Sequence, residues 1–277
     1  MRVLRVCHLL LCFFALLLCA CTGNLKNKDD KNKSNESVKP IALYLFDEGQ
    51  GNAIHDVSSE KPVLPLKIFD NDKNEITWSK KRGLHTRPSQ YRVEKSSMIA
   101  KLKSEKPAAK IINKIKQSQA FSVELWFRPD NVEQTGPVRI ISISKSNGRR
   151  NVTIGHSASA YDFRIRTSDV NLNGLPSLRT ASSYQAKAEL THVVLTYNTN
   201  AAQIYINGES IPWFFYEGEP PGEQLSGNLS NWDDSFKLII GDEFTGDRAW
   251  KGHIYYVAFY DRSLDQKQVL SKLSNGI

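Results

Sequence analysis

Apolar and polar residues alternate with a period of two in several short segments after residue 40. The segment 121–127, FSVELWF, carries an apolar residue at every odd position. Four further segments show the same alternation: 192–197, 203–206, 236–240 and 253–260. Successive side chains of a strand point to opposite faces of its sheet, so this pattern indicates strands with one buried face. Many short strands separated by Gly and Pro predict an all-β protein, a two-sheet sandwich or jelly roll.

Turn and helix signals complete this prediction. Asn207-Gly208 directly follows the segment 203–206 and predicts a tight hairpin, because both residues tolerate positive φ. A short helix is predicted around residues 108–115. Near the end, Ser263 and Gln266 have the spacing of a capping box, which predicts a short C-terminal helix. Its apolar face would be formed by Leu264, Val269, Leu270 and Leu273.

The first twenty residues have the pattern of an export signal. Two arginines precede an apolar run of about fifteen residues, which is shorter than the roughly twenty that a membrane-spanning helix needs. The run ends in Leu18-Cys19-Ala20-Cys21, which resembles the lipobox of bacterial lipoproteins. We therefore predict a lipoprotein signal peptide at residues 1–20 and lipid attachment at Cys21. The alternative is an ordinary signal peptide that contains cysteines and is cleaved close to Cys21.

Cysteine usage supports this prediction. The four cysteines all lie in or at the end of the signal: Cys7, Cys12, Cys19 and Cys21. The exported domain can therefore have no internal disulfide and no cysteine metal site, and lipidation gives Cys21 a role. The lipid bilayer is thus the first predicted partner. Thr22, where an aspartate would signal retention in the inner membrane, favours the outer membrane.

Composition divides the rest of the chain into two parts. Residues 21–39 contain few apolar side chains and are predicted to be a flexible tether, followed by one domain at residues 40–277. The formal net charge of +8 lies partly in the signal and tether, so the domain is only mildly basic. It has no stripe of Lys and Arg with interleaved aromatic residues, so nucleic acid is not an expected partner.

Several segments resemble the LamG-like jelly-roll family in the order in which that family has them. They cover nearly all of residues 40–270: ALYLFDEGQG at 42–51, FSVELWFRP at 121–129, LTHVVLTY at 190–197, IYING at 204–208 and WKGHIYYVAFYDRSL at 250–264. The resemblance implies a concanavalin A-like sandwich of two antiparallel sheets, each with six or seven strands. This fold hosts lectins, glycan hydrolases and adhesion modules, so it does not by itself define a function.

No catalytic residue is predicted. Glycan hydrolases of this fold carry Glu-x-Asp-x-x-Glu on one strand, where alternate carboxylates reach the same cleft. The chain has no such string, and Glu124 stands alone between Ser122 and Trp126 on its side of the segment 121–127. The six histidines are scattered along the chain and are expected to be structural or surface residues rather than ligands.

The resemblance also implies a site for one calcium ion. Carboxylates and backbone oxygens suit this hard cation, and the candidates are Asp47, Glu48 and Asp56 with the backbone near residues 252–255. The chain departs from the family here. Asp56-Val-Ser-Ser lacks the family's glycine, and Tyr255-Tyr256 replaces an acidic pair. The alternative is that Asp47 and Asp56 only cap turns.

Ligand binding would depend on aromatic and arginine side chains, because aromatic faces stack on sugar rings. Asp162, Arg164 and Arg166 alternate on a predicted strand and could form a polar floor on one sheet face. Trp213 is expected to be the most exposed tryptophan, and Trp126 to lie in the core. The alternative is that the tryptophans cover the sandwich edges. The candidate binding residues are Trp213, Tyr216, Trp232, Trp250, Arg164 and Arg166.

These features predict an envelope-anchored, non-catalytic module that binds carbohydrate or protein. Two alternatives remain open at this point. One is a structural or assembly subunit of an envelope or polysaccharide-export complex. The other is a carbohydrate-active enzyme with an unfamiliar site.

Overall fold

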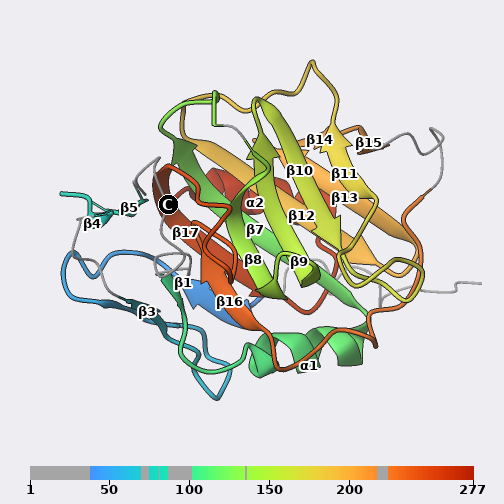
Figure 1. Ribbon diagram of the computed structural model, residues 1–277, viewed down its shortest axis with the longest axis horizontal. Helices are drawn as coiled ribbons and strands as arrows, with labels where there is room; N and C mark the ends of the chain where they lie inside the picture. Colours follow the sequence, from blue (N-terminus) through green and yellow to red (C-terminus); the bar gives the residue numbers. More distant parts are fainter. Residues whose placement is uncertain (1–37, 70–74, 81, 87–101, 135, 217–223) are drawn as a thin grey trace, which may run out of the picture. The chain divides into compact units, whose positions relative to one another are not determined.

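Two antiparallel sheets pack face to face in the computed structural model (Figure 1). The structure describes residues 38–69, 75–80, 82–86, 102–134, 136–216 and 224–277, and Val38–Ile277 forms one compact unit. The predicted signal peptide, Cys21 and the tether as far as residue 37 lie outside the described residues and stay predictions. No described helix has the length and apolarity needed to cross a membrane.

The first sheet contains eight of the described strands. Its order is β14 (Glu209–Ile211), β13 (Ala201–Ile206), β12 (Thr191–Asn198), β7 (Ala120–Pro129), β17 (Gly252–Tyr260), β5 (Leu84–Thr86) and β4 (Ile76–Trp78). The eighth strand, β1 (Ala42–Tyr44), also pairs with β17.

The second sheet contains nine of the described strands. Its order is β15 (Trp213–Tyr216), β11 (Ser177–Thr180), β10 (Ala160–Ile165), β9 (Arg149–Ser157), β8 (Val138–Ser146), β16 (Lys237–Ile240), β6 (Leu102–Ser104), β3 (Leu66–Ile68) and β2 (Ala53–Ile54).

The all-β jelly-roll prediction is confirmed, although each sheet has more strands than the six or seven expected. The additional strands are short, such as β2 with two residues and β3 with three. The long predicted strands are present: the segment 121–127 lies within β7, where Val123, Leu125 and Phe127 are fully buried in the core between the sheets.

Both predicted helices are present. The helix α1 (Ala109–Ser118) lies across one end of the sandwich, where Ile111, Ile112 and Ile115 join the core (Figure 1). The helix α2 (Gln266–Asn275) covers the side of the first sheet that faces away from the core. There Val269 packs with Val194, Tyr205, Ala258 and Tyr260.

The predicted capping box lies two residues later than expected. Asp265, not Ser263, is the N-cap: its carboxylate accepts from the N–H of Gln268, whose side chain accepts from the Asp265 N–H. Leu264 is 1% exposed and packs beneath the helix, so the chain reaches the sheet before the helix begins. The hairpin turn is as predicted, with φ of 49° at Asn207 and 81° at Gly208.

Candidate ligand-binding site

A cluster of charged side chains lies on the side of the second sheet that faces away from the core. In β10, Tyr161, Phe163 and Ile165 point into the core, so Asp162 and Arg164 point to the opposite side. The shared orientation of Asp162 and Arg164 agrees with the predicted polar floor. We call six side chains on and beside this sheet face the arginine cluster: Arg139, Arg150, Asp162, Arg164, Arg179 and Glu243.

Strand pairing brings the cluster to two exposed aromatic rings. Asp162 is opposite Arg179 on β11, and Arg179 is opposite Phe214 on the edge strand β15. Two residues along the same strands, Tyr216 is opposite Ser177, whose hydroxyl accepts from Arg164 Nε at 2.9 Å.

Arg179 stacks on Tyr216. The guanidinium carbon is 3.4 Å from the ring centroid, which is the arrangement of a cation–π contact. Phe214 and Tyr216 are each 41% exposed, and the Arg179 side chain is 15% exposed. A planar cation and two aromatic rings therefore meet solvent side by side at this sheet edge.

Asp162 holds three arginines together. Its carboxylate is 2.5 Å from Arg139 Nη1 and 3.9 Å from nitrogen atoms of Arg164 and Arg179. Nearby, the Glu243 carboxylate accepts from Arg150 Nε at 2.5 Å and from Arg150 Nη2 at 2.9 Å. With four guanidinium groups and two carboxylates, the arginine cluster carries a net charge of +2.

Burial is the main influence on these charges. It lowers the pKa of Arg139, and the adjacent Asp162 opposes that effect. Burial, followed by repulsion from Arg139, lowers the pKa of Arg164 to about 10. Arg164 is therefore still protonated at neutral pH and can attract an anion.

Several donors of the cluster have no hydrogen-bond acceptor among the described residues. They are Arg139 Nε and Nη2, Arg150 Nη1 and Arg179 Nε. Buried polar atoms are usually paired, because leaving one unpaired costs about 1–3 kcal/mol. These buried atoms do not reach a ligand themselves, but the excess of donors leaves a positive potential at the cluster, which favours an anionic ligand over a cationic one.

The predicted tryptophans do not gather at this cluster. Trp232 and Trp250 are 1% and 0% exposed, and their indole N–H groups donate to Arg166 O and His156 Nε2. Neither ring can offer a face to a ligand, so the prediction that Trp232 and Trp250 bind a ligand is wrong. Both side chains pack inside the protein instead. Trp126 is 8% exposed; it lies against His192 rather than in the core between the sheets.

Trp213, expected to be the most exposed tryptophan, is half-buried. Its indole N–H donates to Ala202 O, and its ring packs against Phe215 and the core. It still borders a surface groove of about 470 Å³ together with Gln203 and Ser210. Arg166 follows the end of β10 and lies near Asp233, apart from the arginine cluster.

The three predicted calcium ligands do not converge. Asp47 is exposed, and Glu48 accepts from the backbone and ring nitrogen atoms of His55. The Asp56 side chain is fully buried and pairs with Lys110 Nζ at 2.5 Å. That ammonium also donates to Ser58 Oγ and Glu60 O, so a lysine fills the position where Asp56 would hold a cation.

Glu124 has partners that its isolation in the sequence does not predict. His192 Nε2 lies 3.0 Å from Glu124 Oε1, and the Tyr260 hydroxyl donates to Oε2 at 2.6 Å. Lys272 of α2 donates to the same hydroxyl. Burial, then the charge of Glu124, raises the pKa of Tyr260 well above its usual range. These hydrogen bonds lie beneath α2, and Glu124 is only 2% exposed. They therefore stabilise the packing of the helix on the sheet and do not face a ligand.

Sequence reasoning missed Arg139, Arg150 and Arg179. One local signal was present for Arg139, because it interrupts the apolar run Val138–Ile141, where a charge must be buried and paired. A similar signal exists for Arg179, which alternates with the core residue Leu178. Arg150 gives no such signal, since its partner Glu243 lies in a distant loop.

Comparison with known protein families identifies a family with the fold described above. The chain belongs to the concanavalin A-like lectin/glucanases superfamily, whose model matches residues 104–270, more than half of the chain. No curated protein matches the chain.

Two solved structures illustrate the range of proteins with this fold. Trypanosoma rangeli sialidase in complex with 2,3-difluorosialic acid is similar at 13% identity and a TM-score of 0.53, over 83% of this chain and 32% of the sialidase. The binding domain of botulinum neurotoxin DC, solved in complex with rat synaptotagmin II, is similar at 13% identity and a TM-score of 0.58, over 86% of this chain and 51% of the toxin domain. This chain thus spans about a third and a half of their lengths, and at such identity the likeness is one of fold.

Proposed function

We propose that the protein is a non-catalytic binding module that recognises an acidic carbohydrate at the arginine cluster. The observation that carries this proposal is the stacking of Arg179 on Tyr216 beside Arg164, at an exposed sheet edge with a net positive charge. Guanidinium groups bind carboxylates in a bidentate fork, and aromatic faces bind sugar rings. The same sheet edge can therefore bind both the carboxylate and the ring of an acidic sugar.

The pairing of the carboxylates supports binding rather than glycoside hydrolysis. A glycosidase needs two carboxyl groups that reach the scissile bond of a bound sugar. Asp162 and Glu243 are 1% and 0% exposed, and each lies 2.5 Å from a guanidinium nitrogen. Neither carboxylate can therefore reach a leaving sugar.

We further propose that Cys21 anchors this module to the cell envelope, at the outer membrane. The basic n-region, the apolar run and the Leu18-Cys19-Ala20-Cys21 string support this localisation. About twenty tether residues would separate the lipid from the domain. The domain would then bind its ligand at the cell surface or in the periplasm.

The test is a glycan array that includes uronic and sialic acid glycans, probed with the full chain in detergent micelles. We expect binding of acidic glycans, and a loss of about tenfold or more in affinity for Arg179→Ala, because a charge-assisted hydrogen bond contributes about 1.5–3 kcal/mol. Arg262→Ala is the matched control, since Arg262 is 58% exposed and lies outside the cluster. Equal binding by wild type and Arg179→Ala would refute the assignment of the site. Cross-linking in cells to a protein partner, without any glycan binding, would favour the assembly-subunit alternative.

A further inference from the structure

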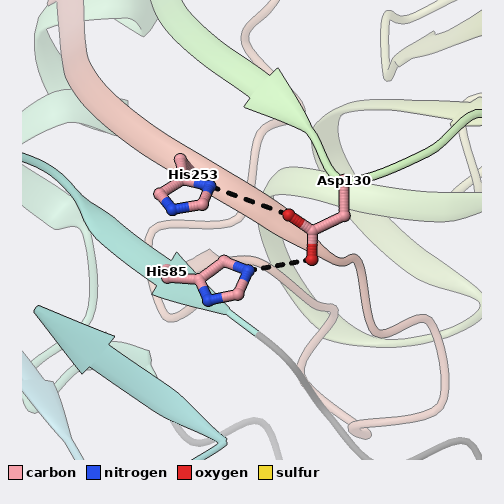
Figure 2. A group of neighbouring side chains, drawn as sticks. All are labelled: His85, Asp130 and His253. Atoms are coloured by element: carbon pink, nitrogen blue, oxygen red, sulfur yellow. Dashed lines mark hydrogen bonds and ion pairs between the residues drawn. The ribbon is translucent and has the colours of Figure 1, made fainter. Parts of the chain in front are cut away.

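Two histidines that are far apart in the sequence lie side by side on the outer side of the first sheet. His85 in the middle of β5 is directly opposite His253 on β17, and Asp130 follows the end of β7 (Figure 2). The flanking residues Leu84 and Ile254 are fully buried, which turns both imidazoles away from the core. The Asp130 carboxylate points between the two rings (Figure 2).

The ligand atoms converge on one point. His85 Nε2 is 2.8 Å from Asp130 Oδ2, and His253 Nδ1 is 3.7 Å from Asp130 Oδ1. The two rings are stacked, with centroids 4.1 Å apart and an interplanar angle of 16°. One nitrogen from each histidine and one carboxylate oxygen all lie within 4.8 Å of one another. In a tetrahedral zinc site with bonds of about 2.0–2.1 Å, ligand atoms are about 3.3 Å apart. To bind one ion, the three ligand atoms would move closer together and the two stacked rings would tilt toward a common point.

Arg128 lies beside the cluster. Its Nη2 is 3.3 Å from His253 Nδ1, the nitrogen that also lies 3.7 Å from Asp130 Oδ1. A bound metal ion would take the place that this guanidinium has beside Nδ1. Arg128 itself is exposed, so its guanidinium can move into solvent when a metal ion binds.

The surrounding backbone holds the three residues in place. Asp130 N donates to Lys251 O at 3.2 Å, which joins the end of β7 to the start of β17. Next to His85, Thr86 Oγ1 donates to Trp250 O at 2.8 Å. The side chains of His85, Asp130 and His253 are 13%, 25% and 18% exposed, so the cluster is rigidly framed and still reached by solvent.

We propose that His85, Asp130 and His253 form a binding site for a divalent transition-metal ion, with zinc as the ion that best fits two imidazoles and one carboxylate. Three protein ligands leave a fourth position for water or for an oxygen atom of a bound molecule. The site is separate from the arginine cluster, which lies on the other sheet, and it stands independently of the proposed glycan binding.

The experiment is a titration of the metal-stripped full chain with ZnCl2, using competition with a chromophoric chelator. The chain is purified in detergent with all four cysteines replaced by serine, so that no thiolate competes for zinc. We expect one saturable site per chain in the micromolar range. The substitutions His85→Ala, Asp130→Asn and His253→Ala should each weaken zinc binding at least tenfold, because removing a ligand costs no less than the roughly 10–100-fold of a supporting residue.

Two controls keep this proposal falsifiable. His55→Ala removes an exposed histidine that pairs with Glu48, and it should leave zinc affinity unchanged. Zinc should also raise the unfolding temperature of the wild type but not of Asp130→Asn, a variant that keeps the size of the side chain. Absence of saturable zinc binding by the wild type, or equal zinc affinity of the wild type and all three cluster variants, would overturn the proposal.

Discussion

Replacing Lys110 with methionine should strongly destabilise the domain. The Lys110 side chain is 4% exposed, and its ammonium forms the counter-charge of Asp56, whose side chain is 0% exposed. The substitution keeps most of the side-chain volume and removes the charge. Three backbone donors to Asp56 would remain: the N–H groups of Leu43, Ser58 and Leu64.

The expected loss of stability is about 3–5 kcal/mol, because removing one partner leaves the other as an uncompensated buried charge. Because the total unfolding free energy of a domain is about 5–15 kcal/mol, the substitution would remove a large fraction of it. For a domain of this size the unfolding temperature should fall by roughly 6–20 °C. Residues 38–277 contain every buried residue described here and can be studied by urea denaturation, followed by tryptophan fluorescence.

The matched control lies one turn further along α1. Lys114 pairs with Glu60 at 3.2 Å, but the two side chains are 40% and 39% exposed. Such surface pairs contribute about 0–1 kcal/mol, so Lys114→Met should change stability only slightly. A similar loss in both variants would show that Lys110 acts through helix propensity or net charge rather than through the buried ion pair.

The pH dependence gives a second readout of the same pair. Burial alone would raise the pKa of Asp56, but the bonds from Lys110, Ser58 and the backbone lower it below 3.8. In the wild type this contribution is fully present above the unfolded pKa and is lost as the pH falls through the folded pKa. In Lys110→Met the buried carboxylate has no counter-charge, so protonation relieves the penalty. The stability gap between the two proteins should therefore narrow from neutral pH to about pH 4, and a gap independent of pH would refute the reasoning.

Three further predictions concern the helix cap, the sheet and the anchor. Asp265→Ala should cost about 1 kcal/mol in urea denaturation, whereas Ser263→Ala should cost almost nothing; the reverse order would move the cap back to Ser263. Gly155→Ala would place a methyl group 1.8 Å from Val138 O, so a loss on the order of 3 kcal/mol is expected, and a variant as stable as wild type would contradict the close approach of β8 and β9. Cys21→Ser should release the protein from membranes in high salt while leaving the domain folded, and continued sedimentation with membranes would argue against lipid anchoring.

The sequence predicted the elements that have a long local pattern. The strand β7 has ten residues, enough for its alternation to be recognised, and the positive φ values at Asn207 and Gly208 follow from the residue types. Short strands such as β5, with three residues, are too brief for a period of two to be recognised. The capping box was placed two residues early because both Ser263 and Asp265 have a glutamine three residues later, and only the burial of Leu264 decides between them.

Partners at long range account for most of what the sequence did not predict. Asp56 was a candidate calcium ligand because nothing near it in the chain suggests that Lys110, 54 residues away, would supply the cation. The pairing of His85 with His253 depends on the register of β5 against β17, which local periodicity does not contain. Asp162 and Arg164 lie on one strand as predicted, and Arg166 lies just beyond its end, whereas Arg179 comes from the adjacent β11 and Arg139 from β8, two strands away.

The pairing of β1 with β17 has a consequence for how the chain folds. Leu43 is opposite Ala258, so the strand that begins the described domain is completed by one near its end. The first sheet cannot close until almost all of the chain has been synthesised. Contacts between such distant residues slow folding, because the entropy of a very long loop is lost before the strands can pair. This late closure is compatible with the export proposed above, because a chain that stays unfolded until its last strands are made can still be threaded through an export channel.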